Sequence, residues 1–174
     1  MILCNYRNNK TQIKKIKKGV KKVARRSRIK MYPDTKTFHY YNANPKNRIT
    51  GDCTFRAICT ALEKDWKDTV MEMAEFSCQT GYAINDNKGI AKYLDKMGWT
   101  KMKQPKKING TKYTGSEFCQ YLNDHFPNGK GISNIVANIG GHHIVCIKYT
   151  DNKFKVNDIW DSTDGCIGNY WIKK

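Results

Sequence analysis

The sequence predicts an α+β fold in which helices come first and antiparallel strands follow. Apolar residues recur at helical spacing between positions 53 and 126, whereas short apolar runs separated by turn residues occupy positions 132–174. Helices followed by a run of strands are typical of α+β folds. The 174 residues suffice for about one domain with its own core.

The first predicted helix spans residues 53–62. One stripe of it is apolar and consists of Phe55, Ile58, Ala61 and Leu62. Gly51 suits a bend just before this helix, and Asp52 is placed to cap its first turn. Upstream, residues 37–41 predict a strand and residues 42–47 a turn-rich loop.

Three further helices follow, each with recognisable boundary residues. The second ends near Gly81, and the third ends at Gly98. The fourth begins with a capping box formed by Thr114 and Glu117. Residues 99–113, between the third and fourth helices, predict a lysine-rich loop or hairpin.

Four strands follow the helices. They are predicted at residues 132–139, 143–149, 154–159 and 169–174. Asp151-Asn152 predicts a two-residue turn, so residues whose numbers sum to 303 face each other across the hairpin. His143 then lies opposite Trp160, with Asp158 as its diagonal neighbour on the same face.

Positive charge is concentrated at the N-terminus. The chain has 32 Lys+Arg against 15 Asp+Glu, a net charge of +17. Residues 1–30 contain 12 basic side chains and no acidic one, whereas residues 31–174 contain 20 against 15. We therefore divide the chain into a basic arm, residues 1–30, helical or disordered, and a domain, residues 31–174. This charge predicts a polyanionic partner: nucleic acid, a nucleoprotein or an acidic protein surface.

The arm surrounds a thin apolar stripe with basic side chains. Four interpretations fit it: a solvated tail, a segment that contacts phosphates, a helix on a membrane surface, or a cap on the domain. The stripe lacks Trp and Phe, which disfavours firm membrane insertion. The residues predicted to contact phosphates are Lys14, Lys15, Lys17, Lys18, Lys21, Lys22, Arg25, Arg26 and Arg28.

The seven cysteines indicate reduced thiols. Their number is odd, and none has zinc-finger spacing with histidine. No apolar N-terminal stretch resembles the core of a secretory signal, and no run approaches about 18 apolar residues. We therefore expect a cytoplasmic protein, in a host cytosol if it is phage-encoded, that does not enter membranes.

Cys53 and His143 form a candidate catalytic pair. A cysteine at a helix start lies near unpaired amides, which lower its pKa and favour the thiolate. The imidazole stores and returns the proton, and Asp158 orients the imidazole, with His142 and Asp161 as alternates. Backbone amides at the helix start, weakly assisted by Asn47, would stabilise the oxyanion.

Each of these residues also has a purely structural interpretation. Cys53 fits a buried small hydrophobe, the histidines fit a strand edge, and the aspartates fit turn or ion-pair roles. A zinc site made of Cys53, both histidines and an aspartate is disfavoured, because the adjacent histidines are its only local ligand pair. We predict neither a metal nor a cofactor.

Four short motifs together resemble a known family. They are Asp52–Ala57, Lys64–Trp66 with Val70, Gly141–Val145 and Asp158–Ser162. In order and spacing they are similar to the papain-like-fold cysteine peptidase-like proteins of bacteriophages and prophages, and the resemblance covers about residues 40–172. It implies a helical N-terminal half packed on a C-terminal antiparallel sheet. It also implies Cys53 as nucleophile, His143 as base and Asp158 as orienting acid.

Two functions follow from these patterns. The first is a thiol hydrolase that cleaves an amide, isopeptide or thioester bond of a protein or peptide substrate. The second is a non-catalytic phage anti-defence protein on the same scaffold. It would bind nucleic acid or a host nucleoprotein through the basic arm and residues 99–113. No sequence-specific RNA-reading motif is present.

Overall fold

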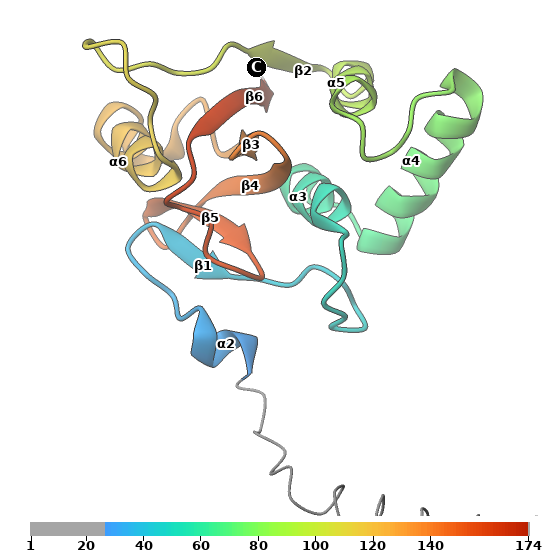
Figure 1. The fold of residues 1–174 in the computed structure, drawn as a ribbon, viewed down its shortest axis with the longest axis horizontal. Coiled ribbons are helices and arrows are strands. Elements are labelled where there is room, and N and C mark those ends of the chain that lie inside the picture. Colours follow the sequence, from blue (N-terminus) through green and yellow to red (C-terminus); the bar gives the residue numbers. More distant parts are fainter. Residues whose placement is uncertain (1–26, 174) are drawn as a thin grey trace, which may run out of the picture.

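The computed structural model describes residues 27–173 and contains a six-stranded mixed sheet with helices on both faces (Figure 1). The strands are β1 (Phe38–Tyr40), β2 (Trp99–Met102), β3 (Asn134–Ile139), β4 (His143–Thr150), β5 (Lys153–Asp158) and β6 (Ile167–Lys173). Their order across the sheet is β1-β5-β4-β3-β6-β2. The α+β class predicted from the sequence is confirmed at this level.

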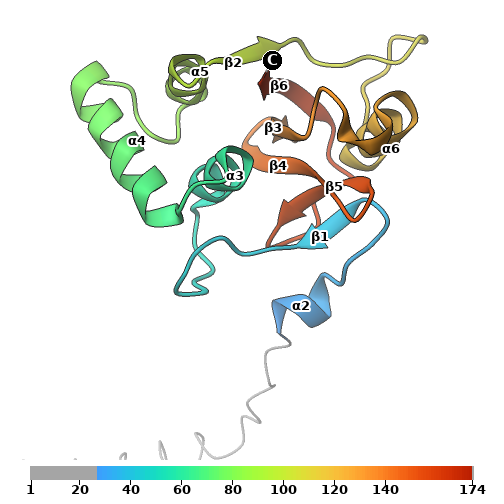
Figure 2. The same cartoon turned by 180° about the vertical axis from the view of Figure 1, so that it is seen from behind.

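The helices divide between the two faces of the sheet. They are α2 (Arg28–Met31), α3 (Cys53–Leu62), α4 (Trp66–Thr80), α5 (Asn87–Lys96) and α6 (Gly115–His125), followed by a 3₁₀ turn, η1 (Pro127–Gly129). Helix α6 covers one face, and α3, α4 and α5 lie on the other, as the view from behind in Figure 2 also shows.

Two cores result because side chains alternate along the strands. Ile135 of β3 packs with Phe118 of α6, whereas its neighbour Val136 packs with Ile58 of α3 and Leu94 of α5. All five side chains are fully buried or nearly so. The sheet therefore serves as the common wall between two apolar layers.

Two features of the predicted fold were wrong. The sheet is not purely antiparallel, because β1 pairs with β5 in parallel, and it is not confined to the C-terminal part of the chain. Residues 99–113 are not only a loop or hairpin, because β2 pairs with β6. The strand predicted at residues 37–41 is β1, but its sequence does not indicate its parallel partner, β5. Strand β2 has four residues, too few to show an alternating pattern.

The predicted register of the last hairpin is confirmed. Cys146 pairs with Asn157 and Thr150 with Lys153, and in both pairs the residue numbers sum to 303. Asp151 and Asn152 both have positive φ, as the favoured two-residue hairpin turn requires. The turn therefore determines which residues of β4 and β5 meet.

The helix boundaries follow from their caps. The capping box of Thr114 and Glu117 is formed at α6, and Asp86 caps α5 through the amides of Lys88 and Gly89. Asp52 occupies the N-cap position of α3, but its side chain makes no capping hydrogen bond. The prediction that it caps this helix was wrong, because its carboxylate pairs with Arg56 instead.

Arg28 is the one predicted phosphate-contact residue inside the described range. It lies in α2, and its guanidinium carbon is 5.7 Å from the ring centroid of Tyr32. The other eight such residues, and residues 1–26 of the predicted arm, lie outside the described residues. No helix among residues 27–173 combines the length and the hydropathy needed to cross a bilayer.

Candidate active site

Cys53 is the first residue of α3 and remains partly exposed. The helix is held against β4 by its apolar stripe, including Ile58, which is fully buried. The sequence begins a helix here because the apolar stripe starts directly after the bend at residues 50–52. The thiol therefore lies at the helix N-terminus beside the start of β4.

His143 is the first residue of β4 and lies beside Cys53. It follows a tight connection in which Gly140 and Gly141 have φ values of 63° and 87°, a conformation that favours glycine. The imidazole is largely buried, with 7% of the residue exposed. Its Nε2 lies 2.6 Å from Oδ2 of Asp158, which leaves Nδ1 for the thiol.

Asp158 is the last residue of β5 and is fixed on three sides. Its backbone carbonyl accepts a hydrogen bond from the amide of Tyr41 at 2.9 Å. Its Oδ2 faces His143, and its Oδ1 accepts a hydrogen bond from Nη2 of Arg56 at 3.1 Å. These contacts leave the carboxylate little freedom to turn away from the imidazole.

Arg56 links the acid of the site to the start of the cysteine helix. It is 3% exposed, and its guanidinium pairs with both Asp158 and Asp52. Asn44 donates a further hydrogen bond from Nδ2 to Oδ2 of Asp52 at 3.1 Å. A buried chain of polar groups thus runs from the loop before α3, through Arg56 and Asp158, to His143.

The role of Arg56 was not predicted from the sequence. The signal available was its position, four residues after Asp52 and three after Cys53, which puts all three side chains at one end of the helix. Its second partner, Asp158, is 102 residues away. No local pattern points to that contact.

The pKa values of the pair shift in opposite directions. Burial alone would raise the pKa of Cys53, but hydrogen bonds from His143 and the amide of Ile144 lower it below its ordinary value. Burial alone would lower the pKa of His143, but Asp158 and Cys53 raise it to about 9. Both shifts favour the thiolate–imidazolium form.

The other described cysteines differ from Cys53. Burial raises the pKa of Cys59 to about 11 and that of Cys119 to about 12, and it also raises that of Cys146. Cys78 and Cys166 are exposed. The pKa of Cys53 is thus lowered where burial raises the pKa of Cys59, Cys119 and Cys146.

The alternates are not brought into the site in the same way. His142 is exposed in the connection before β4. Asp161 accepts hydrogen bonds from the backbone amide and hydroxyl of Thr163, at 3.0 and 2.6 Å, and so closes its own turn. Asn47 lies exposed in the loop before α3 with a φ of 50°. Its backbone amide donates to Asn44, and nothing places its side chain at the thiol.

Trp160 covers the outer side of the imidazole. The rings of Trp160 and His143 stack with centroids 4.5 Å apart and planes 26° apart. This proximity agrees with the predicted register, in which the two residues face each other. The indole shields the bond between His143 and Asp158 from water, which strengthens it.

The described residues offer no ligand cluster for a metal ion, and a cavity at the other end of α3 is separate from the Cys53 site. No group of three or more His, Cys, Asp or Glu side chains among residues 27–173 is arranged to hold a metal ion. A cavity of about 510 Å³ lies at the other end of α3, between Tyr41, Glu63 and Trp66. Cys53 does not line that cavity, so the chemistry belongs to the surface at the helix start.

Comparison of the chain with protein-family models, with curated proteins and with solved structures finds no match in any of the three.

Proposed function

We propose that this protein is a thiol hydrolase in which Cys53 is the nucleophile, His143 the general base and Asp158 the orienting acid. The observation that carries the proposal is the 2.6 Å contact between His143 and Asp158, with the thiol on the other side of the imidazole. A nucleophile beside a base that is oriented by a third group is the usual arrangement of covalent hydrolases.

The residues divide the reaction between them. The Cys53 thiolate attacks the carbonyl carbon of an amide, isopeptide or thioester, and the electron pair of the C=O bond moves to oxygen. When the tetrahedral intermediate collapses, the imidazolium of His143 gives its proton to the leaving amine or thiol. Water then attacks the acyl-enzyme, with His143 as general base, and releases the acid and the thiol.

The start of α3 has no side-chain cap, which leaves backbone amides free for the reaction. Because the Asp52 carboxylate is held by Arg56, no side chain caps the first-turn amides of the helix. Free amides at a helix N-terminus stabilise a developing oxyanion. We assign this role to the backbone at Cys53 and Thr54, and leave Asn47 out of it.

A papain-like arrangement of the domain is part of the same proposal. Three features support it: the cysteine begins a helix, that helix packs on the strand that begins with the histidine, and the acid ends the next strand. Two features are additions to the arrangement expected from the sequence: the parallel edge strand β1 and helix α6 on the second face of the sheet.

The test is the pH dependence of Cys53 alkylation in a Cys4→Ser/Cys78→Ser/Cys166→Ser background. It lacks the two exposed thiols of the described residues and Cys4, which lies outside them. We expect Cys53 to react with iodoacetamide well below pH 8.5, and His143→Ala to move the midpoint up towards about 8.5. Mass spectrometry after addition of p-nitrophenyl acetate should find the acetyl group on Cys53. A midpoint near 8.5 in both proteins, with no acyl-enzyme, would favour the non-catalytic binding protein.

A further inference from the structure

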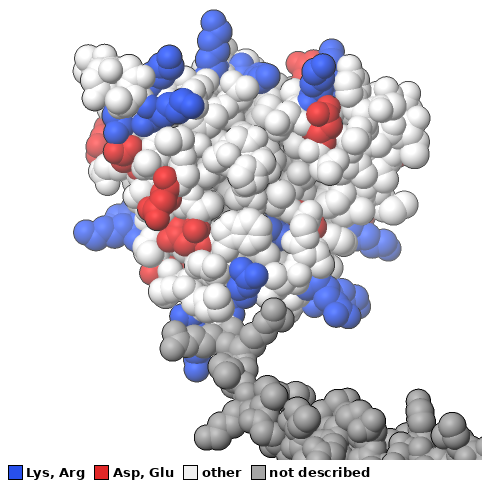
Figure 3. Space-filling model, in the orientation of Figure 1, with Lys and Arg blue, Asp and Glu red and all other residues white. Residues whose placement is uncertain are grey.

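The net positive charge of residues 31–174 comes from one segment, residues 86–113. Residues 86–113 contain eight lysines and two acidic residues, whereas the rest of residues 31–174 contains 12 basic and 13 acidic side chains. In the fold this segment forms α5, β2 and the loop after β2, along the β2 edge of the sheet (Figure 1). Figure 3 shows basic side chains gathered along this upper edge of the molecule. We call residues 86–113 the basic edge.

Most lysines of the basic edge have no acidic partner. Among the ion pairs of the described residues, Lys107 with Glu117 is the one that involves this segment. Lysines on an edge strand discourage pairing with other sheets, and this explains Lys101 of β2. It does not explain Lys88 and Lys92, which lie one turn apart on α5.

These lysines surround a hollow of about 360 Å³. It is lined by Tyr82, Asn87, Lys88, Ala91, Lys92, Asp95, Trp99 and Lys101. Trp99 is buried and belongs to the core beneath. The hollow therefore has an apolar floor, a partly exposed aromatic wall at Tyr82, and three ammonium groups around its mouth.

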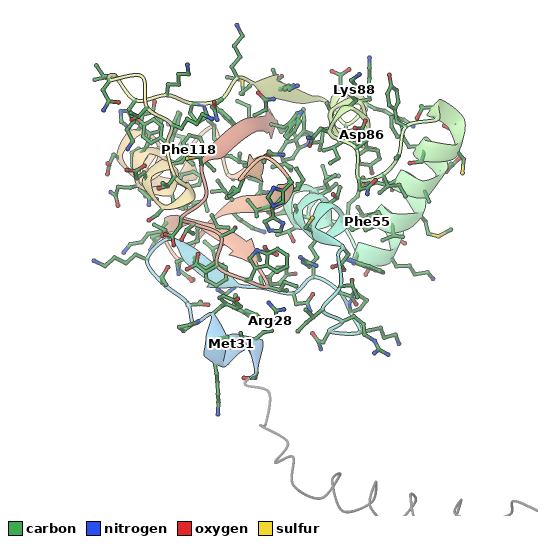
Figure 4. All side chains as sticks on the ribbon, viewed as in Figure 1. Arg28, Met31, Phe55, Asp86, Lys88 and Phe118 are labelled. Atoms are coloured by element: carbon green, nitrogen blue, oxygen red, sulfur yellow. The ribbon has the colours of Figure 1, made fainter. Side chains whose placement is uncertain are left out.

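The wall of the hollow is built into the fold. Gly89 lets the segment before α5 approach the helix closely, since a Cβ there would lie 2.5 Å from the carbonyl oxygen of Ala83 and 3.2 Å from Cβ of Tyr82. Asp86 caps the same turn of α5. Figure 4 places Asp86 and Lys88 at the start of this helix. Tyr82 is thus held beside the lysines before any ligand arrives.

We propose that this hollow and its lysines bind single-stranded nucleic acid. One base would stack on Tyr82 above the apolar floor, and the flanking phosphates would lie at Lys88, Lys92 and Lys101. Proteins that bind single strands without sequence preference combine a cationic groove with aromatic stacking surfaces. The Asp95 carboxylate, which also lines the hollow, suits an exocyclic amino group of the base.

The aromatic wall distinguishes this partner from an acidic protein. Lysines alone would attract either polyanion, but a nucleic-acid strand has a planar base beside every phosphate, whereas an acidic peptide has a ring only where its sequence supplies an aromatic residue. The proposal does not depend on the chemistry of Cys53, which does not line the hollow.

The first experiment measures binding of a fluorescent 12-nucleotide single strand to the full chain by anisotropy at several salt concentrations. The variant Lys88→Gln/Lys92→Gln/Lys101→Gln is compared with Lys36→Gln/Lys46→Gln/Lys67→Gln, which removes equal charge from exposed lysines outside the basic edge. We expect at least about tenfold weaker binding for the first variant only. Its salt slope should fall by up to about 2, as loss of three phosphate contacts requires.

The second experiment separates stacking from charge. We expect Tyr82→Ala to weaken binding by about fivefold or more, while Tyr82→Phe, which keeps the ring, leaves it unchanged. Acetylation by a lysine-reactive ester should be slowed by the oligonucleotide at Lys88, Lys92 and Lys101. The control lysines give the reference rate, so this readout is independent of binding by residues 1–30.

Four results would overturn the proposal. Equal losses in the two triple variants would mean that net charge alone attracts the strand. An unchanged affinity of Tyr82→Ala would mean that no base stacks on the tyrosine. Protection of the three lysines by polyglutamate as strong as that by the oligonucleotide would assign the surface to acidic proteins. No protection at these lysines at saturating oligonucleotide would leave the binding to other parts of the chain.

Discussion

The two ends of α3 carry different kinds of cysteine. Cys53 begins the helix, touches His143 and has a lowered pKa, whereas Cys59, less than two turns later, is buried and has a pKa raised to about 11. At the N-terminal end of the helix, the buried Arg56 pairs with the carboxylates of Asp52 and Asp158. At the C-terminal end, Lys148 forms a solvent-exposed ion pair with Glu63. The same helix therefore shows that the reactivity of a thiol depends on its partners rather than on burial alone.

The largest expected effect comes from replacing the sulfur of Cys53, compared with the same replacement at Cys59. Cys53→Ser should abolish the acyl-enzyme and reduce hydrolysis of a thioester by at least about 100-fold, because the hydroxyl is a far weaker nucleophile at neutral pH. Cys59→Ser should leave the rate within about twofold, since that thiol lies in the core behind Arg56. Stopped-flow hydrolysis with both purified variants measures this, and equal rates for Cys53→Ser and the unmodified chain would contradict it.

The second prediction removes the buried cation. Arg56→Met should lower the free energy of unfolding by about 3–5 kcal/mol, because it leaves the Asp52 and Asp158 carboxylates buried without their partner. Urea denaturation followed by tryptophan fluorescence measures the loss. Arg48→Met is the matched control, since Arg48 is exposed and forms no ion pair in the described structure. A loss below about 1 kcal/mol for Arg56→Met would mean that the buried polar contacts of Arg56 do not stabilise the site.

The third prediction concerns pH. Because the pKa of Cys53 is lowered, the alkylation rate of Cys53 should rise with pH over a lower pH range than that of a free thiol. Hydrolysis should fall again above about pH 9, where His143 loses the proton that the leaving group needs. Asp158→Asn should slow alkylation at pH 6.5 by about tenfold, the change in thiolate fraction for one unit of pKa.

Asp161→Asn is the control for this pH series. Asp161 accepts hydrogen bonds from Thr163 within its own turn. The pH profile of Cys53 alkylation in Asp161→Asn should therefore match that of the unmodified chain. If instead Asp161→Asn reproduces the loss and Asp158→Asn does not, the orienting role belongs to Asp161.

The smallest expected effect lies at the other end of the helix. Lys148→Met breaks the exposed pair with Glu63, and we expect the free energy of unfolding to change by about 0–1 kcal/mol, because solvent screens both charges. The same urea series measures it beside Arg56→Met. A loss as large as that of the buried arginine would erase the energetic difference between the two ends.

The sequence alone determined the local elements of this protein. Apolar periodicity predicted the helix that starts at Cys53, and the capping box of Thr114 and Glu117 predicted the one that starts after Thr114. The Asp151-Asn152 turn gave the register of β4 and β5, and with it the proximity of His143 to Asp158. Each of these follows from contacts between residues close in the chain.

The tertiary structure alone decided the contacts between distant parts of the chain. Three contacts join segments separated by tens of residues or more: the pairing of β1 with β5, the pairing of β2 with β6 at the other edge of the sheet, and the ion pair of Arg56 with Asp158. Such contacts leave no periodic mark in the sequence, because they depend on how complete elements pack and on which buried charge finds a partner there.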